Sequence, residues 1–158
     1  MKTIKLWIFC MAVILMPFQL YAMPRYISPL GERVVIVDPN EHAWGAYAPN
    51  GMLIRSGLAS AGRDFCPDTG RPCHTKVGSF RIRSLGGPGC VSRSFPIPTG
   101  GAPMPYCMYF TGAQALHGSY ELGNANLSHG CVRMRVSDAR WMRFNFARVG
   151  TLVIIKSY

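Results

Sequence analysis

The chain has 158 residues, of which 49% are hydrophobic and 15% are charged, and its formal net charge is +10. This length is enough for one domain with a hydrophobic core. The positive charge suits an anionic surface, but the basic residues are scattered singly, without a run of five or an aromatic-interleaved basic motif. We therefore expect no nucleic-acid partner.

Residues 1–22 have the layout of a secretory signal. Met1–Lys5 form a cationic head, Leu6–Phe18 an almost unbroken apolar run, and Ala22 follows as a cleavage point. The run is shorter than the roughly 20 residues of a membrane span, so we expect a periplasmic or secreted protein without stable membrane insertion after cleavage. An uncleaved anchor is the alternative, because Leu20 is not the small residue expected three positions before the cut. Cleavage removes two lysines and no acidic residue, which lowers the net charge from +10 to +8.

The remainder is expected to be a mainly β domain. Residues 23–32, which contain two prolines and a glycine, are typical of an extended lead-in, and residues 33–158 are expected to form the domain itself. Short β-branched or alternating runs between turn residues predict its strands. These strands are expected at residues 33–38, 42–48, 52–55, 57–62, 77–83, 108–110, 115–117 and 151–156.

One helix is predicted just before the last strand. Its apolar positions, Ala139, Met142, Phe146 and Val149, repeat at helical spacing. Ser137 is expected to cap its beginning and Gly150 to end it. A long aperiodic segment, residues 84–106, lies in the middle of the chain, and such segments are commonly lids or binding loops.

Five cysteines remain once Cys10, inside the apolar run, is set aside. An oxidising compartment favours pairing, and an odd number leaves one thiol over. Four of them lie in the loop-rich middle section, where we predict the pairs Cys66–Cys73 and Cys90–Cys107, although the sequence does not establish this connectivity. The fifth, Cys131, is then a candidate reactive thiol.

The neighbours of Cys131 suit nucleophilic chemistry. A thiol titrates near about 8.5, so at neutral pH it needs a base, and either His117 or His129 is close enough in sequence to serve. Gly130 allows a close backbone approach, so that the amides of residues 129–131 can form an oxyanion hole. Spacing alone does not choose between the two histidines.

Two further residues, and two alternatives, belong to this stretch. Ser128 can stabilise the turn by bonding its own backbone, and Arg133 can bind a substrate carboxylate through two hydrogen bonds. The first alternative is an inert buried cysteine. The second is a metal site, which is disfavoured because the usual Cys-x-x-Cys and paired-histidine spacings are missing.

A family resemblance adds to this interpretation. Ser128–Met134 reads Ser-His-Gly-Cys-Val-Arg-Met and resembles the signature of the L,D-transpeptidase (YkuD-type) catalytic domain, and His117–Ser119 is similar to that family's upstream His-Gly-Ser/Thr. Thr75–Ile82 resembles its Thr-Pro-x-Gly-x-Phe-x-Ile motif, with Lys76 in place of proline. The likeness implies a β-sandwich or barrel of short strands with one helix before the last strand.

The resemblance also implies roles for individual residues. Cys131 is the nucleophile and His117 the general base and acid, oriented by a backbone carbonyl near Gly118 or Ser119, while His129 becomes a structural or oxyanion-side residue. Neither a metal nor an organic cofactor is implied. The other positions carried over are Ser128 and Gly130 on the oxyanion side, and Gly118, Ser119 and Arg133 for substrate binding.

The implied reaction is acyl transfer on peptidoglycan stem peptides. The Cys131 thiolate attacks the carbonyl of the third, diamino-acid residue of a stem tetrapeptide, D-alanine leaves, and the thioester passes to an amine of a second stem or of a protein lysine. Residues 84–106 would cover the donor peptide. Carbapenem β-lactams acylate this family, so we expect an adduct at Cys131.

Two departures concern the acceptor side. The gap between His117 and Ser128 is shorter than is usual, and the insert with four extra cysteines resembles a short enhanced-entry subgroup. The alternatives are a hydrolase on the same scaffold and a non-catalytic secreted factor that binds cell wall or host surfaces. A zinc site made of Cys73, His74 and Cys131 is the least favoured alternative.

Overall fold

The computed structural model describes residues 23–158, so the predicted signal at residues 1–22 lies outside the described residues. In this part of the chain nine strands form two sheets. The five-stranded sheet has the order β3-β2-β1-β9-β4 and consists of β1 (Val34–Asp38), β2 (Ala43–Tyr47), β3 (Leu53–Leu58), β4 (Gly78–Arg81) and β9 (Leu152–Ile155). The four-stranded sheet has the order β5-β6-β7-β8 and consists of β5 (Ser84–Leu85), β6 (Met108–Thr111), β7 (Gln114–Ser119) and β8 (Val132–Arg135).

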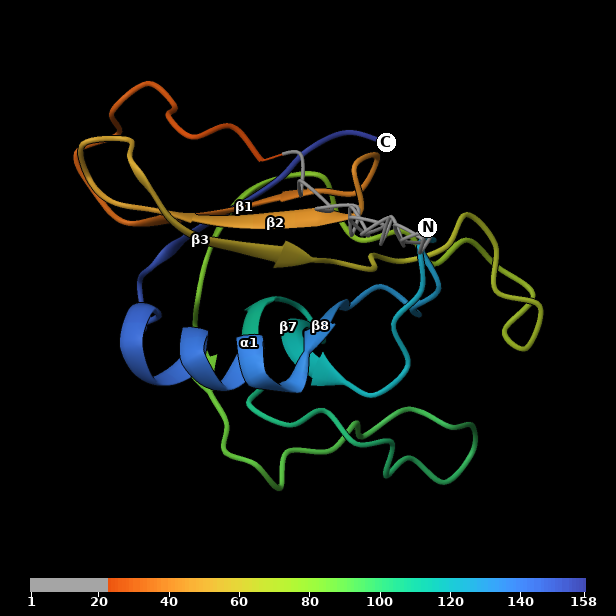
Figure 1. The fold of residues 1–158 in the computed structure, drawn as a ribbon. Helices are drawn as coiled ribbons and strands as arrows, with labels where there is room; N and C mark the ends of the chain where they lie inside the picture. Colours follow the sequence, from red (N-terminus) through yellow and green to blue (C-terminus); the bar gives the residue numbers. More distant parts are fainter. Residues whose placement is uncertain (1–22) are drawn as a thin grey trace, which may run out of the picture.

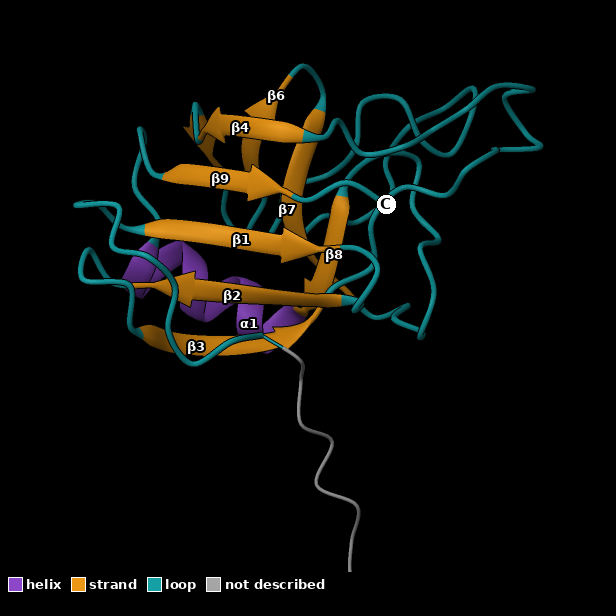
Figure 2. Ribbon diagram, turned by 90° about the horizontal axis from the view of Figure 1, so that it is seen from above, coloured by secondary structure: helices purple, strands orange, loops and turns teal. Residues whose placement is uncertain are grey.

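Two pairs are parallel, β1 with β9, which joins the two ends of the domain, and β7 with β8, and the other pairs are antiparallel. The five-stranded sheet lies over β7, β8 and helix α1 (Val136–Trp141) (Figure 1). Seen from above, β7 and β8 cross the strands of the first sheet steeply, and long loops gather at one end of the sheets (Figure 2). The predicted mainly β architecture with one helix before the last strand is confirmed.

The main core lies between the two sheets and the helix. It is made of buried side chains from all three, among them Val35, Val37, Trp44, Phe110, Leu116, Val132, Met134, Met142 and Phe146. The opposite face of the first sheet is covered by the lead-in, where Tyr47 Oη donates a hydrogen bond to the carbonyl of Pro24 at 3.0 Å. Because β1 is covered on both faces, all five of its residues are buried, which explains its continuous apolar run.

The strand expected at residues 57–62 is not a separate strand. Gly57 and Leu58 complete β3, and the chain then makes only two isolated bridges, Ser60 with Arg133 and Gly62 with Ser128. Backbone bonds from Ser60 N and Arg133 N close the first bridge at 3.0 and 2.9 Å. These bridges attach residues 60–62 to the segment that contains Cys131.

Both predicted ends of the helix are wrong. The chain passes from β8 directly into α1, so Arg135 occupies the N-cap position without a side-chain cap bond, and Ser137 lies exposed in the first turn. The helix continues as a π-helical turn, Met142–Phe146, and ends there, four residues before Gly150. Val149 is therefore beyond the helix and 64% exposed, although Ala139, Met142 and Phe146 are buried as expected. Within residues 23–158, no helix has the length and apolar character needed to cross a membrane.

Candidate active site

The candidate site is built on the outer face of the four-stranded sheet. In the parallel pair of β7 and β8, Leu116 is opposite Val132 and His117 is opposite Arg133. Side chains alternate along a strand, so Leu116 and Val132 enter the core while His117 and Arg133 point to the other side. Cys131, immediately before β8, lines the same cavity as these two residues.

This cavity has a volume of about 610 Å³. One wall comes from the long loop between β5 and β6, through residues 92–95 and 102–104, and another from residues 112–114 in the turn between β6 and β7. Ser119 at the end of β7 and the two residues that follow it complete its border. The segment 84–106, predicted to be a lid or binding loop, therefore contributes directly to the cavity.

His117 is held as a neutral, oriented imidazole. It is 5% exposed, and its Nδ1 lies 2.8 Å from the carbonyl oxygen of Gly118. A carbonyl only accepts, so Nδ1 carries the hydrogen and Nε2 keeps its lone pair. Burial lowers the pKa of His117 from 6.5 to about 4. The hydrogen bond to Gly118 raises this pKa in part, and the charge of Arg133 lowers it by a smaller amount. The ring is thus able to accept a proton at neutral pH.

Cys131 is the only cysteine outside a disulfide among residues 23–158. Its Sγ lies 3.7 Å from the carbonyl oxygen of Ala113. Burial raises the pKa of the Cys131 thiol, while the backbone amide of Ala115 and the charge of Arg133 lower it in part. These shifts favour a protonated thiol and a neutral imidazole at neutral pH.

The turn before Cys131 is held by Ser128, which is 1% exposed. Its Oγ accepts a hydrogen bond from the Gly130 amide at 3.0 Å and donates a short one to the carbonyl of Cys131. The turn-stabilising contact suggested by the sequence is thus present. Because the Gly130 amide is used in this way, it is not free for the expected oxyanion hole, for which the amides of residues 129 and 131 remain.

Gly130 is favoured by its backbone conformation and by the position of the Gln114 side chain. Its φ of +115° is strained for residues with a side chain, and an added Cβ would lie 2.7 Å from Nε2 of Gln114. Its carbonyl accepts a hydrogen bond from Thr75 Oγ1 at 2.9 Å, and Thr75 Oγ1 in turn accepts one from the Gly62 amide at 2.9 Å. The peptide before Cys131 is therefore fixed from two sides.

The model of one protein family, the L,D-transpeptidase catalytic domain (YkuD), matches residues 32–155. The chain belongs to this family. A comparison with curated protein sequences gave no match.

Solved structures of L,D-transpeptidases are similar to the chain. One from Xylanimonas cellulosilytica has a TM-score of 0.69 and 25% identity, over 82% of this chain and 63% of that one. One from Mycobacterium smegmatis has a TM-score of 0.65 and 24% identity, over 80% and 59%. L,D-transpeptidase 3 from Mycobacterium tuberculosis, in complex with a faropenem-derived adduct, has a TM-score of 0.62 and 24% identity, over 79% and 60%. The chain thus spans less than two thirds of the length of each.

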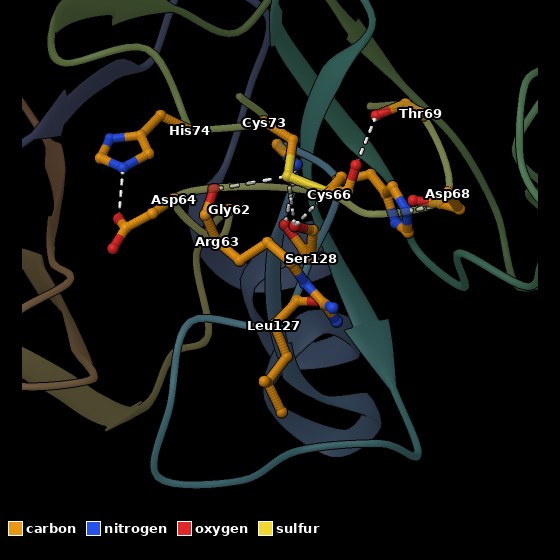
Figure 3. Close-up of a disulfide and its surroundings, with 12 residues drawn as sticks. Gly62, Arg63, Asp64, Cys66, Asp68, Thr69, Cys73, His74, Leu127 and Ser128 are labelled. Atoms are coloured by element: carbon orange, nitrogen blue, oxygen red, sulfur yellow. Dashed lines mark hydrogen bonds and ion pairs between the residues drawn. A yellow bond between two sulfur atoms is a disulfide. The ribbon is translucent and has the colours of Figure 1, made fainter. Parts of the chain in front are cut away.

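In this L,D-transpeptidase domain, a disulfide supports the turn before the thiol. Cys66 pairs with Cys73, and their sulfurs lie 4.0 and 3.8 Å from the carbonyl oxygen of Ser128 (Figure 3). Cys90 pairs with Cys107 and ties the long loop to the residue before β6. These are the two pairs expected from the sequence.

His129 is held between the two loops that carry the disulfides. Its Nε2 lies 2.7 Å from Oδ2 of Asp68, and the ring of Phe95 packs on its imidazole with centroids 4.2 Å apart. This position suits a structural role for His129. Cys66, Asp68 and His129 also place three ligand atoms within 4.8 Å of one another, but Cys66 has no thiolate to offer because it is in the disulfide. For the same reason Cys73 is unsuited to the zinc site considered from the sequence.

Sequence reasoning missed several residues of this L,D-transpeptidase site. Thr75 belonged to a quoted family motif, so its place in that motif was the available signal. Gln114 accepts from the Lys76 amide at 2.9 Å and donates to the His74 carbonyl at 3.0 Å. Oε2 of Glu121 lies 3.6 Å from Nη1 of Arg133. No local pattern marks Gln114 or Glu121, because their partners are distant in sequence or separated from them by a loop.

Proposed function

We propose that the protein is an exported peptidoglycan L,D-transpeptidase in which Cys131 is the nucleophile and His117 the general base and acid. The observation that carries the proposal is the presence of a free thiol and a buried, neutral histidine in the lining of one cavity, in a domain of this family. Export rests on the layout of residues 1–22, and the domain is assigned to residues 33–158, after the lead-in at residues 23–32.

In the first half of the reaction, His117 Nε2 accepts the thiol proton as Sγ attacks the carbonyl carbon of the stem's third residue. The C–S bond forms, the peptide bond to D-alanine breaks, and the proton passes from His117 to the leaving amine. Because burial disfavours the charged forms of both groups, proton transfer accompanies the attack instead of preceding it. The amides of residues 129 and 131 are the donors proposed for the developing oxyanion.

In the second half, an amine attacks the thioester. The C–N bond forms, the C–S bond breaks, and the proton removed from the amine by His117 returns to the Cys131 sulfur. A stem-peptide amine gives a cross-link between third residues, and a protein lysine gives an attached protein. Water in place of the amine gives hydrolysis on the same scaffold.

The two arginines of the cavity suit an anionic peptide. Arg93 and Arg133 both line it, and we assign Arg133 to a carboxylate of the stem peptide. Gly118 orients His117 through its carbonyl, and Ser119 lies on the cavity wall beside it. The loop at residues 84–106 covers the donor, through residues 92–95 and 102–104, which line the cavity. The reaction as proposed uses neither a metal nor an organic cofactor.

The proposal is tested by incubating the mature protein with a stem tetrapeptide and measuring free D-alanine and the peptide products. We expect release by the wild type and its loss in Cys131→Ala and His117→Asn. His42→Asn is the matched control, because His42 is outside the cavity and its φ of +48° is one that asparagine tolerates. Cross-linked dimer identifies a transpeptidase and shortened peptide a hydrolase. Undiminished D-alanine release by Cys131→Ala would contradict the proposal.

A further inference from the structure

Among the residues that line the cavity, Glu121 is the only one with a carboxylate. The fully charged cations of the wall are Arg93 and Arg133. Glu121 belongs to the short segment after β7, two residues beyond Ser119, and it faces the same space as Cys131 and His117. A carboxylate at this place repels the carboxylates of a stem peptide, so its presence requires an explanation in terms of the substrate.

The contact between Glu121 and Arg133 leaves the Glu121 carboxylate accessible, while the Arg133 side chain is 21% exposed and lines the cavity. Glu121 Oε2 is 3.6 Å from Arg133 Nη1, beyond the roughly 3.2 Å limit of a good hydrogen bond, and the Glu121 side chain is 86% exposed. Its backbone is nevertheless anchored, because Ser119 Oγ accepts from the Glu121 amide at 3.1 Å and lies 3.3 Å from the Glu121 carbonyl oxygen. The segment thus presents an exposed, loosely paired carboxylate from a fixed backbone.

A structural role explains this pair poorly. Exposed ion pairs contribute little to stability even at close range. The pairs that connect elements of this fold are much closer: Arg81 contacts both oxygens of Glu32 at 2.7 and 2.8 Å, and Arg55 contacts Asp138 at 2.7 Å. Glu121 and Arg133 are instead loosely paired at 3.6 Å, so a ligand with one positive and one negative group can lie alongside the pair and contact both.

The substrate class proposed above carries matching charges. A diamino acid inside a peptide chain uses one amine in the backbone and keeps the other free, so it supplies an ammonium to a peptide that is otherwise anionic. When the side chain ends as an amino acid, this ammonium and a carboxylate share one carbon, and standard bond lengths place them roughly 3 Å apart. Glu121 and Arg133 present the opposite charges at a similar separation, 3.6 Å.

We propose that Glu121 binds the free ammonium of the donor's third residue while Arg133 binds the carboxylate on the same carbon. Glu121 is then a specificity-determining residue, and the enzyme selects donors whose diamino acid has a zwitterionic side-chain end. This inference rests on the proposed function.

The experiment compares D-alanine release from two stem tetrapeptides, one with the side-chain amine free and one with that amine acetylated. The wild type is expected to prefer the free amine in kcat/KM, and Glu121→Gln to reduce the ratio of the two kcat/KM values about fivefold, the upper range for a solvent-accessible ion pair. Glu121→Asp should keep part of the preference. Glu41→Gln, which removes an acidic charge outside the cavity, should keep all of it.

Formation of a faropenem adduct by each variant, followed by intact mass, shows that the thiol remains active. An unchanged ratio in Glu121→Gln overturns the inference. If Glu121→Gln accelerates D-alanine release from both donors equally, the inference is overturned too, because Glu121 then only blocks access to Arg133. Wild-type protein that forms the adduct but releases D-alanine from neither donor contradicts the proposed function itself, and the inference with it.

Discussion

His117 on β7 lies directly opposite Arg133 on β8 in the parallel register of the two strands. The guanidinium charge lowers the pKa of both His117 and the Cys131 thiol. Burial acts on the two groups in opposite directions, lowering the first pKa and raising the second. Arg133 therefore favours the neutral base and partly offsets the desolvation of the thiolate, in addition to its proposed contact with substrate.

The first prediction concerns the pH dependence of acylation. Because the pKa of His117 is lowered to about 4, the base is neutral well below the range of an ordinary histidine. The rate of faropenem adduct formation is expected to stay level between about pH 5.5 and 7.5 and to fall only toward pH 4. A half-maximal rate near pH 6.5 would contradict the neutral buried base.

The second prediction concerns stability. The unfolded chain binds a proton at His117 near pH 6.5, whereas the folded chain does so only near 4, so stability falls as the pH decreases through this interval. The shift corresponds to about 3 kcal/mol at most. The difference in unfolding free energy between the wild type and His117→Asn should therefore change by an amount of this order between pH 7 and pH 4.5. A pH-independent difference, measured by urea denaturation, would contradict it.

Gly130→Ala should impair both folding and catalysis. Its φ of +115° and the 2.7 Å approach of a Cβ to Gln114 Nε2 predict a loss of about 1–3 kcal/mol of unfolding free energy. They also predict slower adduct formation, because the turn before Cys131 shifts. Gly87→Ala is the control, since a Cβ there has open space and its φ is not in the left-handed region. Equal behaviour of the two variants would show that the turn geometry is not limiting.

Ser128→Ala and Ser137→Ala should differ sharply. The first removes two hydrogen bonds at a buried site and is expected to cost about 1–3 kcal/mol of unfolding free energy. The second changes an exposed residue that makes no cap bond, so its effect should stay within about 0.5 kcal/mol. Thermal or urea unfolding measures both. A large loss in Ser137→Ala would restore the capping role predicted from the sequence.

Local patterns predicted most strands because the strands are short, apolar and bounded by turns, as at Val34–Asp38. The helix ends could not be found in this way. Ser137 has the side chain of a cap, but the direct passage from β8 into α1 moves the cap position to Arg135. Gly150 has the positive φ of a helix-ending residue, but the π-helical turn brings the helix to its end at Phe146.

In the site, too, local sequence predicted some features and not others. The residues around Cys131 could be predicted because they are contiguous in the sequence. The free thiol could be predicted because the number of cysteines is odd. The supports Gln114 and Asp68 could not be predicted, because they reach Lys76 and His129 through contacts that only the fold creates. Thr75 had a signal only in the family motif, which does not reveal its contact with Gly130. Spacing could not choose between the two histidines either. The structure distinguishes the two histidines by their environment. His117 is buried with its Nδ1 bonded to the Gly118 carbonyl, whereas His129 is paired with Asp68.

The most direct test of the account is the intact mass of the mature protein after incubation with faropenem or a carbapenem, beside Cys131→Ala. The relative from Mycobacterium tuberculosis was solved with a faropenem-derived adduct. We predict one adduct on the wild type and none on Cys131→Ala, which would establish Cys131 as an accessible, activated nucleophile. A folded wild-type protein with a free Cys131 thiol and no adduct would contradict the L,D-transpeptidase mechanism and favour a non-catalytic binding factor.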